Sequence, residues 1–277
     1  MAIKFQCRHC GMTYKVKDEL AGKKVKCKQC NKPMSIPGSA ERSESGAPIL
    51  RHQARERDFD LAVGDGEAIE QIENHITQFI HEPAWVFHEL ISDLVHLDVH
   101  VIKPTAEFNW YTLVTTGMSD MPMTVPDGAE HLCYAELVLH LPPDWRVSER
   151  AFKKDANYWP VYWLKSLARM PHEYETWLSV GHTIPNGDPP QPFDDGTEMC
   201  CWLLMSPVLL PDDFAVLEID DEKAINFLMM IPLYREEVDF KLKHRVEGFV
   251  DRLEGLPLEQ LFDFGRKNVC KKRFGIF

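Results

Sequence analysis

The middle of the chain alternates between the two sides of an extended backbone, which is the pattern of a β-strand. From Leu132 to Leu141, apolar residues recur at every second position on one side, and Tyr, Glu and His share the other side with Leu and Val. Upstream, the β-branched and aromatic run Trp110–Thr116 ends at Gly117, a residue that makes turns easily. Because a strand repeats every two residues, Asn109–Leu141 predicts two paired strands joined by a loop.

The same patterns assign most of the remaining body to strands and helices. Extended apolar or alternating runs predict further strands over Trp85–Ser92, Leu94–Ile102, Met199–Met205, Phe214–Ile219 and Ala224–Ile231. Apolar residues spaced by three and four positions predict helices over Asp65–His81, Asn157–Met170 and Tyr234–Leu253. Pro160 is expected in the first turn of the second helix, where a proline is tolerated. The proline-rich segment Val180–Phe193 predicts a long turn region.

Charge divides the chain into a basic head and an acidic body. The 277 residues are 44% hydrophobic and 10% aromatic, which indicates a globular protein with a sizeable core. Residues 1–37 carry nine Lys or Arg against two acids, a net charge of +7, and the other 22 basic and 41 acidic residues give −19. An acidic body argues against nucleic acid as its main partner and favours a basic protein partner.

The basic head contains two CxxC pairs with the spacing of a zinc site. Cys7 and Cys10 form one pair, Cys27 and Cys30 form the other, and 16 residues separate them. A redox dithiol is the alternative, but redox CxxC pairs usually belong to a βαβ pattern, which is missing from this segment. Two such pairs can complete a tetrahedron around one Zn²⁺. Because four thiolates leave no open position, we expect one structural zinc ion per chain.

The head also resembles a known small module. The stretch IKFQCRHCGMTYKVKDELAGKKVKCKQCNKPMSIP is similar to the zinc ribbon found at the N-termini of many bacterial proteins. This resemblance implies a zinc-bound adaptor. Its lysines leave contact with nucleic acid open, and a solvated basic face is the alternative.

Linker composition predicts where the head ends. Residues 38–57 are small, polar and charged, and they show no sustained period. We therefore predict a zinc ribbon over residues 1–37, a flexible linker over 38–57 and a main domain over 58–277. The chain begins with no apolar signal core, and its apolar runs fall short of the ~20 residues that a membrane helix needs. Cysteines used as metal ligands suit a reducing compartment, so we expect a cytoplasmic protein without a membrane partner.

Two histidine motifs in the body could support chemistry. His96, Asp98 and His100 share one side of a predicted strand, and together they could hold a catalytic metal ion. The alternative is a polar, half-exposed strand face, because residues two apart on a strand are ~7 Å from each other, a long span for three ligands. His182, in a Gly/Pro loop, could act as a general base or could simply order the loop. No nucleophile stands at a recognisable spacing from these residues.

The body resembles a known family in several anchors that occur in a fixed order. These anchors read YTLVTTGMSDMPM, YAELVLHLPPDW, YWPVYWLKSLARMP, GHTIP and NFLMMIPLYREE, and they extend from about Phe87 to Leu253. This order is similar to the suppressor of fused domain in its bacterial form. The resemblance implies an α+β fold, a mixed sheet body flanked by helices, and a protein-binding role without catalysis. Animal members hold a transcription factor in the cytosol, and bacterial members are linked to toxin neutralisation as immunity proteins.

Two functional hypotheses therefore stand. The first is a non-enzymatic protein-binding module, an immunity-type or regulatory protein that sequesters a toxin or a regulator. Met118, Met121 and Met123 would suit an adaptable contact surface, or else they pack in the core. The second is a metal-dependent hydrolase that uses His96, Asp98 and His100. The polar residues of the central loop, Thr116, Ser119 and Asp120, are expected to bond the local backbone and stabilise the turn.

Overall fold

The computed structural model describes residues 2–7, 9–20, 23–36, 41–52, 57–253 and 255–271. It separates into two compact units, which are described one at a time. The small unit comprises Met1–His52 together with Leu242–Arg245, and the large unit comprises the rest of the chain. The predicted boundary at Pro37 and residues 53–56 of the predicted linker lie outside the described residues.

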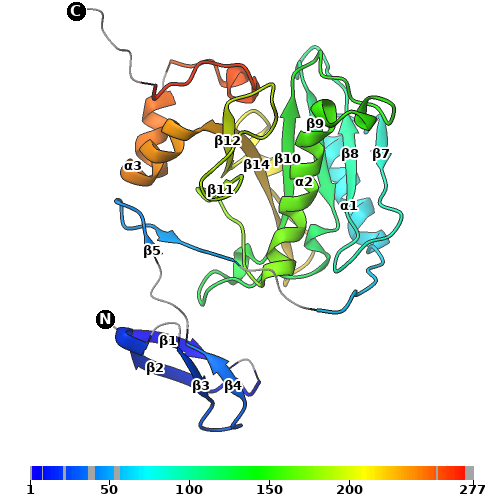
Figure 1. Ribbon diagram of the computed structural model, residues 1–277. Helices are drawn as coiled ribbons and strands as arrows, with labels where there is room; N and C mark the ends of the chain where they lie inside the picture. Colours follow the sequence, from blue (N-terminus) through cyan, green and yellow to red (C-terminus); the bar gives the residue numbers. More distant parts are fainter. Residues whose placement is uncertain are drawn as a thin grey trace, which may run out of the picture. The chain divides into compact units, whose positions relative to one another are not determined.

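The small unit consists of short antiparallel hairpins (Figure 1). Its pairs are β1 (Ala2–Gln6) with β2 (Thr13–Lys17), β3 (Lys24–Lys26) with β4 (Pro33–Ser35), and β5 (Glu41–Arg42) with β6 (Pro48–Ile49). The first two hairpins enclose the two CxxC pairs. Gly11 and Asn31, each one residue beyond a pair, have φ of 71° and 58°. Only residues that tolerate a left-handed backbone suit these two turns.

The large unit is built on an eight-stranded mixed sheet with the order β11-β12-β14-β10-β9-β8-β7, where β13 also pairs with β14. In Figure 1 this order runs from left to right. Pairing between β10 and β14 is parallel, and the other pairs are antiparallel. The strands are β7 (Trp85–Phe87), β8 (Asp98–Ile102), β9 (Tyr111–Thr116), β10 (Tyr134–Leu141), β11 (Thr183–Pro185), β12 (Met199–Met205), β13 (Val216–Glu218) and β14 (Ala224–Tyr234).

Helices cover both faces of this sheet. In Figure 1, α2 (Asp155–Tyr174) crosses the front of the sheet and α1 (Gly66–Phe79) lies behind it. Alternate residues of β10 pack into the core that includes α2, as the alternation predicted. The residues between them are buried as well, including Glu136 and His140. The central strands therefore lie between two apolar layers, and a polar side chain on them must find its partner inside the protein.

Several predicted boundaries differ from the structure. The expected strand Trp85–Ser92 ends at Phe87, because residues beyond it leave the sheet and bond to one another through polar side chains. Helix α2 begins at Asp155, so Pro160 lies beyond its first turn. Helix α3 (Arg235–Leu253) follows the prediction, but its backbone breaks at Arg245, where φ is 64°. The turn-rich segment contains the short strand β11.

The basic stretch Arg266–Lys271 is anchored in the large unit by its first residue. The Arg266 side chain is fully buried and pairs with Glu237, 2.6 Å away. The Tyr234 hydroxyl donates to the carbonyl oxygen of Arg266, and Val269 N–H donates to Glu237. Among the described residues, no helix is both long and apolar enough to cross a membrane.

Candidate functional site

The four head cysteines converge in the small unit. Cys7 Sγ is 3.7 Å from Cys30 Sγ, and Cys10 Sγ is 3.5 Å from Cys27 Sγ. All four sulfur atoms lie within 4.8 Å of one another. Thiolates that surround Zn²⁺ tetrahedrally at ~2.3 Å are roughly 3.8 Å apart, so the donor set fits zinc.

One cysteine of the second pair, Cys27, has surroundings that favour a thiolate. The backbone N–H groups of Gln29 and Cys30 point at Cys27 Sγ at 3.4 Å, and the Tyr14 hydroxyl is 3.1 Å from the same sulfur. The backbone N–H of Cys30, followed by the Tyr14 hydroxyl, lowers the pKa of the Cys27 thiol to about 5. Hydrogen bonds to the charged form have this effect. The turn thus favours the ionised sulfur that binds a metal.

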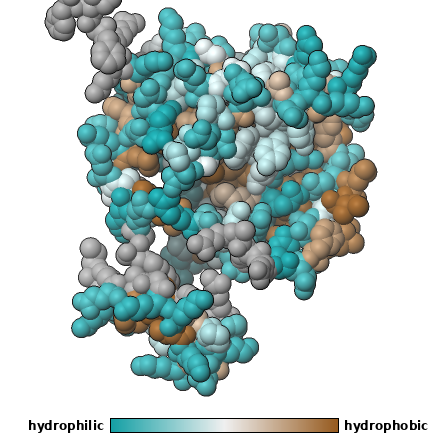
Figure 2. Space-filling view, in the orientation of Figure 1, coloured by the Kyte–Doolittle hydropathy of each residue, from teal (hydrophilic) through white to brown (hydrophobic). Residues whose placement is uncertain are grey.

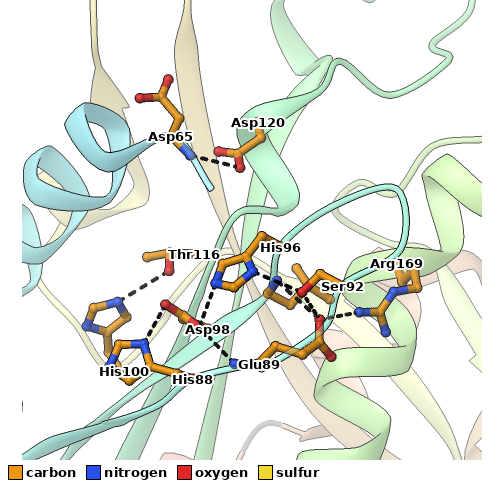
Figure 3. Close-up of polar contacts among 11 residues, drawn as sticks. Asp65, His88, Glu89, Ser92, His96, Asp98, His100, Thr116, Asp120 and Arg169 are labelled. Atoms are coloured by element: carbon orange, nitrogen blue, oxygen red, sulfur yellow. Dashed lines mark hydrogen bonds and ion pairs between the residues drawn. The ribbon is translucent and has the colours of Figure 1, made fainter. Parts of the chain in front are cut away.

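In the large unit, His96 and Asp98 come together, but His100 does not join them. Asp98 and His100 belong to β8, and His96 precedes that strand. His96 Nε2 is 3.4 Å from Asp98 Oδ1, whereas His100 Nε2 is 3.3 Å from the Thr116 hydroxyl (Figure 3). Burial lowers the pKa of His100, which keeps the imidazole neutral. Across the described ranges, the four cysteines are the group of three or more potential ligands that could surround one ion.

Ser92, His96 and Asp98 nevertheless lie in a row that resembles a catalytic triad. The Ser92 hydroxyl is 2.9 Å from His96 Nδ1, which extends the contact between His96 and Asp98. Ser92 is buried, however, and its hydroxyl donates to Glu89 Oε2 over 2.7 Å. A catalytic serine instead gives its proton to the histidine and faces the substrate. The row is therefore better explained as a structural network.

This network connects the β7–β8 segment to helix α2. Arg169 of α2 donates to Glu89 Oε2 over 2.7 Å (Figure 3). It also donates to the carbonyl oxygen of Asp93 at 3.4 Å. Asp98, at the start of β8, accepts from Glu89 N–H at 3.1 Å and contacts His88 Nδ1 at 2.9 Å. Each carboxylate accepts several hydrogen bonds, so the segment is fixed on both sides. The sequence did not reveal the roles of Glu89 and Arg169, because their partners are distant along the chain.

The central loop is organised by a buried carboxyl group that sequence reasoning missed. Ser119 donates to Glu136 Oε1 from its N–H at 2.9 Å and from its hydroxyl at 2.7 Å, and the Thr115 hydroxyl donates to Oε2 at 2.6 Å. Burial raises the pKa of Glu136 to about 7. The one available signal was a lone carboxylate within the apolar run YAELVLHL.

The predicted loop residues have partners other than those expected. The Ser119 hydroxyl donates a hydrogen bond to Glu136 on β10, and the Thr116 hydroxyl contacts His100. Asp120 accepts a hydrogen bond from the backbone N–H of Asp65 at 3.3 Å. The expectation that they bond the local backbone was therefore wrong. Two of the loop methionines, Met118 and Met123, are buried in the core, which favours the packing alternative for them. Met121 is exposed.

His182 follows Gly181 in the segment before β11. Its ring packs edge-on against Trp177, with ring centroids 4.7 Å apart. Burial and the nearby ammonium group of Lys241 lower its pKa. Trp177 and the loop enclose the imidazole, so the contacts agree with the loop-ordering alternative rather than with a general base.

A comparison with family models identifies the chain. The model of the suppressor of fused protein (SUFU) matches residues 93–267, which is more than half of the sequence. The chain belongs to the SUFU family. The match contains the central loop, the β10 strand and the buried Arg266, and it begins after the head with its four cysteines.

Solved structures of other SUFU proteins share the fold. A SUFU homologue from Neisseria gonorrhoeae has a TM-score of 0.56 and 15% identity, over 76% of this chain and 100% of that chain. The Sufu–Fu complex structure gives a TM-score of 0.50 and 13% identity, over 74% of this chain and 91% of that chain. At these identities the likeness concerns the fold. No curated protein sequence matches this chain. The predicted family and α+β fold are confirmed.

Proposed function

We propose that this SUFU-family protein is a non-enzymatic module that binds and sequesters another protein. The observation that carries the proposal is the family match over residues 93–267, together with a solved relative whose structure is a complex of Sufu with Fu. Family membership supports a protein-binding role for the large unit. A toxin or a regulatory protein in the same cytoplasm would be a suitable partner.

The polar groups of the large unit support a binding role over catalysis. The Ser92 hydroxyl donates its hydrogen bond to the Glu89 carboxylate, and the His100 ring contacts the Thr116 hydroxyl. Neither group is in position to activate a substrate. The metal-dependent hydrolase that would use His96, Asp98 and His100 remains the second candidate, although the separation of His100 from the other two argues against it.

We further propose that the small unit is a structural zinc ribbon held by Cys7, Cys10, Cys27 and Cys30. Its closed donor set would stabilise the fold of a segment too short to form a core of its own. It would act as an adaptor for the binding domain. Its lysines keep a contact with nucleic acid open as a secondary property.

The binding proposal is tested with the full-length protein in its native cells. We expect affinity capture after crosslinking to recover a specific protein, and the purified pair to form a stoichiometric complex in calorimetry. If that protein is a toxin, co-expression should restore growth. Failure to recover any stoichiometric partner at native concentration would contradict the proposal.

Metal analysis separates the two candidates. In a Cys27→Ser variant of the full chain, we expect zinc content to fall close to zero, which leaves no metal for a hydrolase. A metal ion that remains at one per chain and is then lost in His96→Ala would instead favour the hydrolase.

A further inference from the structure

The most exposed large apolar side chains of the described chain gather on two neighbouring segments. They range from 60% exposed for Phe59 to 95% for Leu90, and every other large apolar residue whose side chain the structure describes is more buried than these. The members of this group, named here the apolar ridge, are Phe59, Leu61, Val63, Leu90 and Ile91. Figure 2 shows brown side chains gathered at the right-hand side of the large unit, where Figure 1 draws the segment between β7 and β8.

Backbone hydrogen bonds hold the two segments of the ridge side by side. Leu61 forms an antiparallel bridge with Asp93, and Ala62 N–H donates to the carbonyl oxygen of Ser92 at 3.1 Å. Leu94 N–H donates to the backbone carbonyl oxygen of Asp60 at 2.9 Å in the same register. The exposed side chains therefore belong to two segments that lie side by side, although these segments are distant in the sequence.

Ionic contacts beneath the ridge fix its position. Arg57 pairs with Asp93 through two hydrogen bonds of 2.8 and 2.6 Å, and Asp93 also accepts from Asp60 N–H. Glu89, immediately before Leu90, is held by Arg169 of α2. The ridge is thus displayed by an ordered framework. Soluble proteins rarely keep such apolar groups together in water unless they bind something, and an ordered surface loses little entropy on binding.

The charges around the ridge indicate the chemistry of the partner. Both nearby arginines, Arg57 and Arg169, are neutralised by Asp93 and Glu89. The exposed carboxylates of Asp58 and Asp60 alternate with Phe59 and Leu61, and the described residues offer them no ion-pair partner at contact distance. An apolar strip beside exposed carboxylates matches a segment that carries both apolar and basic side chains.

We propose that the apolar ridge is the docking surface for a protein segment whose apolar side chains are flanked by Lys or Arg. The inference rests on the proposed binding function and assigns it to a specific surface. Apolar contact with Leu90, Ile91 and Val63 supplies most of the affinity. Attraction to Asp58 and Asp60 selects basic partners and makes association depend on salt.

Site-specific crosslinking in native cells tests the surface. The full-length protein carries the photoreactive residue p-benzoylphenylalanine at Leu90, or at Val208, an exposed apolar position outside the ridge. We expect Leu90 to crosslink to a protein segment rich in apolar residues and in Lys or Arg, and Val208 to give a much weaker product. Equal products at both positions, an acidic segment, or a crosslink to a second copy of the chain would overturn the proposal.

Binding of the identified segment, made as a peptide, measures the contribution of each group. We expect Leu90→Ser with Ile91→Ser to weaken binding about tenfold or more, and Asp58→Asn with Asp60→Asn to weaken it about threefold and to reduce its salt dependence. The matched control Met121→Ser with Val208→Ser should bind like the wild type. A full-length Leu90→Ser, Ile91→Ser variant that still captures its partner would overturn the ridge while leaving the proposed function intact. A wild-type protein that captures nothing would contradict both.

Discussion

Gly117 and His96 lie so close that no side chain fits between their backbones. A Cβ atom on Gly117 would stand 1.8 Å from the carbonyl oxygen of His96, and Gly117 has a φ of 96°. Glycine is therefore required for space and for backbone conformation at once. The contact packs the central loop against the segment that leads into β8. It thereby joins the network around Glu136 to the network around Glu89.

Gly117→Ala should destabilise the large unit by about 3 kcal/mol or more, because the clash is with backbone and cannot be relieved by a rotamer change. Urea unfolding monitored by tryptophan fluorescence measures the loss. Gly128→Ala is the matched control: Gly128 has a φ of 88° but open space around it, so only the conformational cost of about 1–2 kcal/mol applies. Equal losses in the two variants would show that the contact with His96 is unimportant.

Glu136 should make stability fall as pH rises from about 4.5 to 7. Its pKa is raised from 4.5 to about 7 in the folded protein, so the folded state binds the proton more tightly. The group is thus most favourable below pH 4.5, and ionisation costs about 3 kcal/mol above pH 7. Glu136→Gln should remove this dependence, as measured by urea unfolding at several pH values.

The comparison with Glu136→Gln must use the difference between the two proteins, because His140 acts in the opposite direction. Burial lowers the pKa of His140 from 6.5 to about 3, so its contribution to stability is lost as pH falls through that range. Subtraction of the two pH profiles removes this shared term. A difference that stays constant between pH 4.5 and 7 would contradict the assignment to Glu136.

Arg266→Met should cost about 3–5 kcal/mol, since it leaves the fully buried Glu237 carboxylate without its ionic partner. The double variant Arg266→Met with Glu237→Met should recover part of that loss, because it removes both buried charges. The free energy of unfolding in urea is the measurement for all three proteins. Additive losses in the double variant would mean that the two side chains stabilise the protein independently.

Substitution of the head cysteines should affect zinc and the small unit alone. Cys27→Ser is expected to reduce zinc from one ion per chain to about none and to unfold the small unit, because metal binding and folding are coupled in such segments. Elemental analysis and protection from proteolysis between residues 1 and 52 measure the two effects. Cys133→Ser, a thiol outside the cluster, should retain the zinc. Full zinc content in Cys27→Ser would rule out this site.

The predicted part of the fold is the part encoded by local patterns. Period-two alternation identified β10, helical spacing identified α1, and Asp65 accepts hydrogen bonds from the first backbone N–H groups of that helix. Element ends were less predictable. The strand expected to continue to Ser92 stops at Phe87, because Glu89, Ser92 and Asp98 bond to one another and draw the chain out of the sheet.

Among the candidate sites, sequence spacing was sufficient only where the chemistry is local. The two CxxC pairs predict the cluster of four sulfur atoms, because each pair lies within one tight turn. His96, Asp98 and His100 also looked like a set, but in the structure His96 contacts Asp98, whereas the His100 ring contacts Thr116. Spacing along a strand gives the side of the sheet, and it leaves open which neighbouring strand supplies the partner.

By itself, the sequence determined the strand and helix types, the cysteine donor set and the family, since these depend on residues close together in the chain or on motifs in fixed order. Only the tertiary structure decided that Glu136 is buried between two apolar layers, that Arg266 returns to Glu237, and that Leu61 pairs with Asp93. Such contacts join residues tens of positions apart. Their energies come from burial and pairing, which exist only once the sheet and its helices have packed.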